Sequence, residues 1–153
     1  MTTGMKIGEL AQATLCSVET VRYYEREGLL PAPTRSSGNY RMYGHAHVER
    51  LQFIRHCRSL DMTHDEIRTL LSFRDAPDRQ CEEVNTLLDE HIGHVVQRIG
   101  ELKHLERELK KLRSQCRVVR ATRDCAIMQS LARNSQSVKT AVDEHRSLRR
   151  THR

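Results

Sequence analysis

A long apolar stripe runs along residues 81–113 and limits, more than any other feature, what this chain can fold into. Its members recur every three or four residues: Val84, Leu88, Ile92, Val95, Ile99, Leu102, Leu105, Leu109 and Leu112. The flanking positions are rich in Glu, Lys and Arg, so the spacing predicts one long helix with the narrow seam of a coiled coil. No other segment is long enough to cover that seam. We therefore expect a second copy of the chain to cover it, which makes a homodimer.

The composition excludes several classes of protein. No stretch approaches the ~20 consecutive apolar residues that a membrane helix needs, and aromatic residues make up only 4% of the 153 positions, which argues against a β-sandwich. The N-terminus lacks the apolar run of a signal peptide. We therefore expect a mainly helical protein that works in the cytoplasm and has no membrane partner.

The net charge of +6 is concentrated near the end of the chain. Residues 114–153 hold nine Lys or Arg against three Asp or Glu, whereas the preceding part is close to neutral. Bulk charge therefore gives no argument for nucleic-acid binding by the N-terminal half, and the placement of individual side chains has to supply it.

Two short helices are expected near the N-terminus. Ile7 and Leu10 recur at helical spacing, and Ser17 is a suitable N-cap for a second helix from Val18 to Glu27 that ends at Gly28. The second helix presents hydroxyl, guanidinium and phenol groups on its outer side. This arrangement predicts a helix-turn-helix whose second helix recognises DNA.

A small wing is expected after the helix-turn-helix. The pair Gly38-Asn39 lies between short strand-like runs, which predicts a hairpin with a two-residue turn. On its second strand Tyr40 and Met42 should face one way, and Arg41 and Tyr43 the other.

Two further helices complete the N-terminal domain, and the chain as a whole divides into four parts. A third helix is expected over about 45–60, and the capping-box sequence Thr63-His64-Asp65-Glu66 starts a fourth. The fold class is then mainly α, with a winged helix-turn-helix DNA-binding domain over 5–75 and an antiparallel coiled-coil dimerisation helix over 80–113. A metal-binding loop and short helix follow over 114–132, and 133–153 form a disordered basic tail.

The candidate DNA contacts lie on the second helix and the wing. Arginine gives charge-assisted bonds to phosphates and tyrosine hydroxyls add neutral ones. The alternative is an ordinary mixed polar surface. The predicted set is Ser17, Thr20, Arg22, Tyr23, Arg35, Asn39, Tyr40, Arg41 and Tyr43.

Three of the five cysteines form a candidate metal site, Cys81, Cys116 and Cys125. A helix over 81–113 would separate Cys81 from Cys116 of its own chain by ~50 Å. In an antiparallel dimer the start of one helix lies beside the end of the other, so Cys81 of one chain meets Cys116 and Cys125 of its partner. The alternative is that these are scattered, inert cysteines. Cys57 lies on an apolar stripe and Cys16 in a turn, where packing is the simpler role.

Histidines and the basic tail offer weaker candidates. His91 and His94 are one turn apart on the long helix, but a solvated flank explains them as well as a metal pair does. His145 and His152 could form an auxiliary site in the tail. The tail arginines are explained by simple solvation.

Several motifs resemble the MerR family of bacterial transcription regulators. They are Ile7-Gly8-Glu9-Leu10-Ala11, Val21-Arg22-Tyr23-Tyr24-Glu25, Gly28-Leu29-Leu30 and Asn39-Tyr40-Arg41-Met42-Tyr43, and the resemblance covers about residues 5–131. The segments 51–62 and 87–92 are similar to the lead- and cadmium-responsive branch (PbrR and CadR type). The resemblance implies the same dimeric winged fold and the same three cysteine ligands. The DNA contacts that it implies are Arg22, Tyr23, Arg35, Asn39, Tyr40, Arg41 and Tyr43. It also implies that metal binding makes the protein distort promoter DNA for RNA polymerase.

The resemblance and the ligand chemistry together rank the effector metals. Three thiolates without a histidine suit a soft divalent ion, so we rank Pb and Cd first, Hg next and Zn last. Zinc-sensing relatives carry a double cysteine where this chain has Gln115-Cys116. Two rivals remain: a regulator of the same fold that senses redox state or an organic effector, and an enzyme with a cysteine nucleophile, for which no Cys–His pair can be identified.

Overall fold

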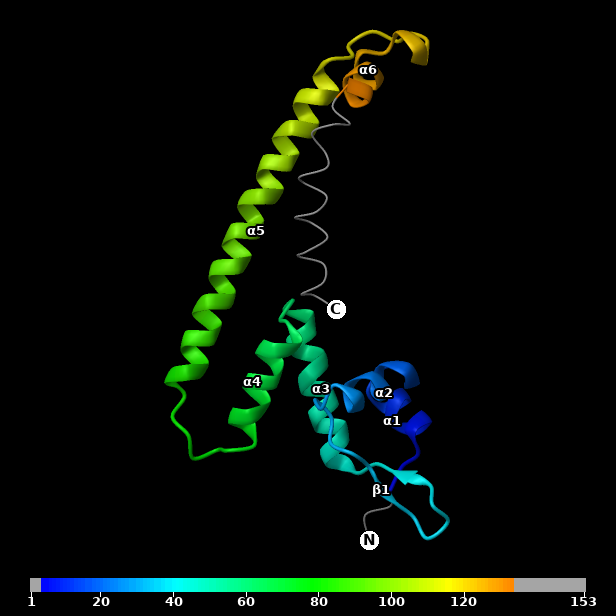
Figure 1. The fold of residues 1–153 in the computed structure, drawn as a ribbon, viewed down its shortest axis with the longest axis vertical. Helices are drawn as coiled ribbons and strands as arrows, with labels where there is room; N and C mark the ends of the chain where they lie inside the picture. The colour runs from blue at the N-terminus through cyan, green and yellow to red at the C-terminus, as the bar shows by residue number, and fades with distance from the viewer. Residues whose placement is uncertain (1–3, 134–153) are drawn as a thin grey trace. The chain divides into compact units, whose positions relative to one another are not determined.

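The protein is mainly helical and divides into two compact units between Gln80 and Cys81 (Figure 1). The structure is a computed structural model, and it describes residues 4–133. The first unit contains α1 (Ile7–Ala13), α2 (Val18–Arg26), β1 (Thr34–Arg35), β2 (Arg41–Met42), α3 (His45–Ser59) and α4 (His64–Arg74). The second contains α5 (Glu82–Ser114), a 3₁₀ turn η1 (Thr122–Asp124) and α6 (Ala126–Arg133).

The core of the first unit is built from one apolar stripe on each of its four helices. Leu10 of α1, Val21 of α2, Leu51 and Ile54 of α3 and Ile67 of α4 have no exposed surface. Each comes from a helix too short to be stable alone, so burial of these side chains is what holds the helices in place.

Local sequence signals fix the helix ends. Ser17 caps α2 by accepting the Thr20 N–H at 3.0 Å. At α4 the Thr63 hydroxyl accepts the Glu66 N–H at 3.2 Å, and the Glu66 carboxylate accepts the Thr63 N–H at 2.7 Å, so the predicted capping box is confirmed. Gly28 follows α2 with φ +70°, a left-handed conformation that glycine adopts without strain.

The turn between α1 and α2 is tied to α3. The Thr14 hydroxyl donates to the Leu10 carbonyl at 2.7 Å, and Arg55 of α3 donates to the Thr14 carbonyl at 2.5 Å. The next residue, Leu15, has φ +54° and is 80% exposed. A leucine in this conformation crowds its own backbone and gains little by burial.

The wing differs from the predicted hairpin. Thr34 pairs with Met42 and Arg35 with Arg41 in an antiparallel register, so five residues join the two strands and the predicted two-residue turn is wrong. Asn39, not Gly38, takes the left-handed conformation, with φ +63°. The Asn39 N–H donates to the Ser36 carbonyl at 2.9 Å, which closes a four-residue turn of the kind that precedes a bulge.

The second unit is dominated by α5. The predicted long helix is present over Glu82–Ser114, 33 residues, and none of its residues is buried within one chain. The predicted stripe is open to solvent: Ile92 is 58% exposed, Leu102 51% and Leu109 56%. Ion pairs on the flanks, such as Arg98–Glu101 at 3.0 Å, stabilise the helix, but they do not bury the apolar side chains of the stripe.

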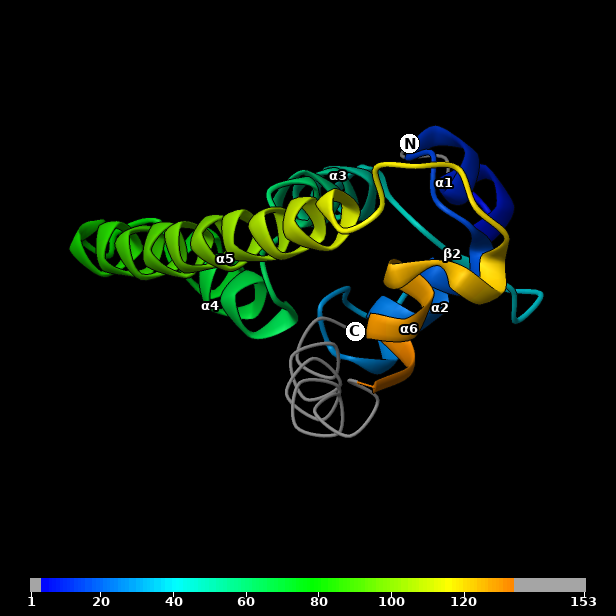
Figure 2. The ribbon, with the colours of Figure 1, turned by 90° about the horizontal axis from the view of Figure 1, so that it is seen from above.

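A loop returns from the end of α5 to α6. The loop passes through η1, and α6 lies beside the C-terminal end of α5 (Figures 1 and 2). The predicted short helix over 126–131 is confirmed and continues to Arg133. The expected disordered tail lies outside the described residues, apart from Arg133. No helix among residues 4–133 combines the length and the apolar character needed to cross a membrane.

Replacing Leu15 by glycine should stabilise the first unit. The change removes left-handed strain and an exposed side chain, which outweighs the added flexibility of the unfolded chain, and we expect the free energy of unfolding to rise by about 0.5–1 kcal/mol. Urea unfolding followed by circular dichroism measures it. Leu60→Gly is the matched control, because Leu60 is also exposed but has φ −90°. It should lose stability, and a loss of stability in Leu15→Gly as well would contradict the strain argument.

Candidate nucleic-acid interface and metal centre

Polar side chains gather at the start of α2, and one of them caps the helix. The Ser17 and Thr20 hydroxyls are 2.8 Å apart, and Ser17 is also occupied in capping the helix. Arg22 lies one turn further along and is exposed. Of these three predicted contacts, Arg22 therefore has the side chain that is most open to a ligand.

Tyr23 is held against α4. Its hydroxyl is 3.2 Å from Nδ1 of His64, its ring centre lies 5.4 Å from that of the histidine ring, and the guanidinium carbon of Arg26 lies 5.9 Å from the tyrosine ring centre. The pKa of His64 is lowered from its ordinary value, mainly because burial disfavours the imidazolium and secondly because Arg58 is nearby. A neutral ring with an unprotonated Nδ1 accepts a hydrogen bond from the Tyr23 hydroxyl, which holds the half-buried phenol in place.

The tip of the wing is ordered by its own side chains. Arg35 donates to the backbone carbonyl of Asn39 at 3.1 Å and to its side-chain oxygen at 3.3 Å. Tyr40 is 66% exposed, and the Lys6 ammonium lies 5.9 Å from its ring centre. The exposed hairpin thus offers a guanidinium and a phenol, and the Lys6 ammonium, from the start of α1, lies beside the phenol ring.

Tyr43 corrects the predicted set of DNA contacts. Its side chain has no exposed surface, and its hydroxyl donates to Oε1 of Glu25 at 2.5 Å. Burial, followed by this bond to a carboxylate, raises the tyrosine pKa to about 12. The prediction that Tyr43 contacts DNA is wrong in this structure, because the residue anchors the wing to the core instead.

Arg41 remains at the surface on the same side of the strand as Tyr43. Its guanidinium is 3.7 Å from the Glu25 carboxylate. The predicted pairing of Arg41 and Tyr43 on one strand face is therefore confirmed, since both reach the same residue of α2.

A depression of about 320 Å³ lies between α2 and the wing. Its lining is formed by Glu25, Arg26, Ala32, Pro33, Arg35 and Arg41. Three guanidinium groups around a concave surface suit an anion such as a backbone phosphate. The sequence-based set missed Arg26, although its position four residues after Arg22 places both on one helix face.

The structure brings two of the three metal-candidate cysteines together. Cys116 follows the end of α5, Cys125 immediately precedes α6, and their side chains are within hydrogen-bonding reach. The Cys116 thiol also lies 3.5 Å from the Val118 carbonyl. Cys81 is exposed at the other end of α5, so the 33-residue helix keeps it ~50 Å away from this pair in one chain.

The pKa of the Cys125 thiol is lowered from its ordinary value. The backbone N–H of Met128 is the largest cause, with smaller contributions from Ile127 and the Cys116 side chain. These N–H groups belong to the first turn of α6, where a helix has unpaired donors. The site thus favours a thiolate, which is the form that binds metals.

The other two cysteines belong to the first unit. Cys57 is buried, and burial raises its thiol pKa, as expected for a core residue. Cys16 packs partly against the same core. Neither contributes to the candidate metal site.

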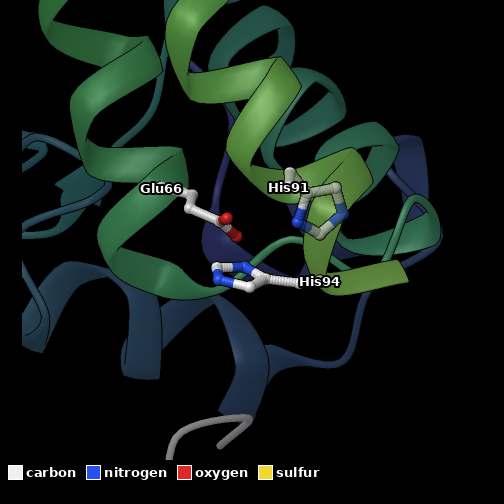
Figure 3. Close-up of side chains that lie close together, drawn as sticks. All are labelled: Glu66, His91 and His94. Carbon is white, nitrogen blue, oxygen red and sulfur yellow. The ribbon is translucent and has the colours of Figure 1, made fainter. Parts of the chain in front are cut away.

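Figure 3 shows three further side chains with metal-binding atoms, Glu66, His91 and His94. His91 and His94 leave α5 one turn apart. The Glu66 carboxylate of α4 is already used in the capping box, where it accepts the Thr63 N–H at 2.7 Å. Glu66 belongs to the first unit and the two histidines to the second, and we assign no metal site to them.

Comparison with known proteins points to one family. A model described as MerR HTH family regulatory protein matches residues 5–73, and one described as MerR, DNA binding matches residues 48–112. The chain is 51% identical over 111 residues to an HTH-type transcriptional regulator ZntR homolog of Haemophilus influenzae, covering 72% of this chain and 82% of that one. It is 34% identical to the ZntR regulator of Escherichia coli K12, covering 88% and 97%.

Two solved structures are similar over most of the chain. The transcription regulator PbrR691 from Ralstonia metallidurans CH34, in complex with lead(II), matches with a TM-score of 0.75 and 54% identity, covering 83% of this chain and 98% of that one. The dual-function regulator MerR of Bacillus megaterium MB1, in complex with mercury(II), matches with a TM-score of 0.61 and 34% identity, covering 84% and 99%.

Alkylation of the folded, metal-free protein should distinguish the cysteines. Because its pKa is lowered, Cys125 keeps more thiolate at pH 7, whereas Cys57 is buried with a raised pKa. We expect iodoacetamide to modify Cys125 much faster than Cys57 at pH 7, measured by peptide mass spectrometry. In urea-unfolded chain, the control, both should react at similar rates. Equal rates in the folded protein would contradict this description of the site.

Proposed function

The chain belongs to the MerR family of helix-turn-helix regulatory proteins, and from this we propose that it is a homodimer that binds promoter DNA and activates transcription when it binds a soft metal ion. The observation that carries the proposal is the pairing of Cys116 and Cys125 at one end of an unburied helix that begins at Cys81. Only a second chain can bring the third thiol to that pair.

The dimer follows from the exposed stripe of α5. Its apolar side chains, among them Ile92, Ile99 and Leu105, are 46–58% exposed in one chain. A second α5 packed antiparallel buries both stripes and sets the start of each helix beside the end of the other. Cys81 of one subunit then completes the site formed by Cys116 and Cys125 of its partner.

The donor set fits a soft ion. Three thiolates suit lead, which accepts three sulfurs on one side, and also cadmium and mercury, while zinc prefers four ligands. PbrR691, 54% identical to this chain, was solved with lead(II). This supports Pb as a candidate, and we keep the order inferred from the ligand chemistry and the family resemblance: Pb and Cd first, Hg next and Zn last.

The DNA-binding surface consists of α2 and the wing of each subunit. Arg22, Arg26, Arg35 and Arg41 offer guanidinium groups for phosphates, and the two α2 helices of a dimer enter successive major grooves. Ser17, Thr20, Tyr23, Asn39 and Tyr40 add polar contacts. Metal binding changes the relative pose of the two DNA-binding domains and distorts the promoter for RNA polymerase, at a DNA deformation cost of ~1–6 kcal/mol.

This function is regulatory rather than enzymatic, and we place it in the cytoplasm, where thiols stay reduced and DNA is available. The rival regulator that senses redox state or an organic effector predicts cysteines without a metal. An ultraviolet thiolate-to-metal charge-transfer band on titration of the reduced protein separates the two.

Transcription in vitro tests the proposal directly. The template carries the promoter next to the gene for this protein, and Pb, Cd, Hg and Zn are titrated in turn with a bacterial polymerase. We expect activation at the lowest concentrations of Pb or Cd. Activation by an oxidant under metal-free conditions, and by none of the metals, would replace the proposal with its redox rival.

Single substitutions of the ligands should separate metal response from DNA binding. Cys81→Ser, Cys116→Ser and Cys125→Ser should each abolish metal-dependent activation and leave operator affinity within about twofold, because the DNA-contacting residues precede residue 44. Cys57→Ser is the control: it should respond to metal but lose about 1–3 kcal/mol of stability, since it buries a hydroxyl in the core. Full induction of Cys81→Ser by Pb and Cd would exclude the bridging site.

Leu102→Asp should disrupt both assembly and metal binding. The change puts a charge into the dimer seam, so we expect a monomer by sizing chromatography with light scattering, and no tight metal binding. Lys103→Asp makes the same substitution at the next position, outside the stripe, and should remain dimeric. A Leu102→Asp monomer that still binds metal through all three thiols would contradict the cross-subunit site.

A further inference from the structure

One acidic side chain lies inside the arginine-rich surface between α2 and the wing. Glu25 is in the last two turns of α2, and it lines the same depression as Arg26, Arg35 and Arg41. Its side chain is only 13% exposed. A carboxylate at a surface that receives phosphates opposes binding by simple electrostatics, so its placement needs a compensating role.

The contacts of Glu25 supply such a role. Its carboxylate accepts the Tyr43 hydroxyl through Oε1 at 2.5 Å, and its Oε2 is 3.7 Å from the Arg41 guanidinium. Arg41 and Tyr43 flank Met42 on the second strand of the wing. One carboxylate of α2 thus contacts two residues of the wing.

The anchor is firm on the wing side. Tyr43 is fully buried and exchanges two backbone hydrogen bonds with Met5, at 2.8 and 2.9 Å. Arg41, by contrast, has a side chain that is 46% exposed and keeps its guanidinium at the rim of the depression. Glu25 therefore connects a buried residue to a partly exposed cationic side chain and restricts where that cation can point.

We propose that Glu25 is a positioning residue for DNA binding, which fixes Arg41 and the base of the wing relative to the recognition helix so that both elements meet one operator together. The inference rests on the proposed function as a DNA-binding regulator. A side chain held in its bound position loses less conformational entropy when it meets a phosphate.

The two roles of Glu25, as a negative charge and as a positioning residue, predict opposite effects of Glu25→Gln on the affinity for DNA. Glu25→Gln removes a negative charge from the DNA-binding surface, so electrostatics alone predicts tighter binding. The amide can still accept the Tyr43 hydroxyl but no longer pairs with Arg41. Positioning therefore predicts weaker binding, by about three- to tenfold, and only while Arg41 is present.

A double-mutant cycle tests the proposal in the full-length dimer. The probe is a DNA duplex selected by the wild-type protein from a random-sequence pool, and affinities are measured by fluorescence anisotropy at several salt concentrations. The variants are Glu25→Gln, Arg41→Gln and the double variant. Glu27→Gln is the matched control, because it removes an acidic side chain two residues away whose charge pairs with Arg68 and not with the wing.

We expect Glu25→Gln to weaken binding, Glu27→Gln to leave it unchanged or tighter, and the double variant to bind at least as tightly as Arg41→Gln. Glu25→Gln that binds as tightly as wild type, or effects that add in the double variant, would overturn the proposal.

If circular dichroism shows that Glu25→Gln is unfolded, Tyr43→Phe replaces it. This change keeps every charge but removes the hydrogen bond from the Tyr43 hydroxyl to the Glu25 carboxylate. An unchanged affinity for DNA would overturn the proposal equally. A wild-type protein that selects no duplex would instead refute the proposed function.

Discussion

The unburied apolar stripe of α5 is the constraint on which the rest of the structure depends. This 33-residue helix has no buried residue and leaves several leucines half-exposed, so it lacks within one chain the packing that supplies most helix stability in proteins. The first unit, by contrast, closes a complete core with side chains such as Leu10 and Ile67. The dimer is therefore needed by the second unit, and it couples two DNA-binding units that could each fold independently.

The same helix explains how the metal chemistry is distributed along the chain. Helix α5 keeps Cys81 ~50 Å from the Cys116–Cys125 pair of its own chain, so in the proposed site the third thiol comes from a second subunit. The first turn of α6 favours the Cys125 thiolate through the N–H groups of Met128 and Ile127. In this proposal, a metal that joins the two ends contributes binding energy only in the dimer pose that it fits, and so acts as an effector.

Local signals in the sequence were enough for most of the fold. The Thr63–Glu66 capping box, the Ser17 cap and the stripe of α5 each act within a few residues or one helical period, and all three are present. A tertiary contact accounts for the failure at Tyr43. The period of the strand paired Arg41 with Tyr43, but nothing local reveals that Tyr43 is buried on Glu25, 18 positions earlier. The link between Tyr23 and His64 spans 41 positions and was equally invisible.

Mixed dimers test the central claim, that each metal site is shared between two chains. A Cys81→Ser subunit and a Cys116→Ser/Cys125→Ser subunit, carrying different affinity tags, are co-expressed and the mixed species is purified. The account predicts that neither parent dimer binds lead tightly, whereas the mixed dimer binds one ion, because one of its two sites regains all three thiols. A mixed dimer that binds no lead, or a Cys81→Ser parent that binds it as tightly as wild type, would contradict the account.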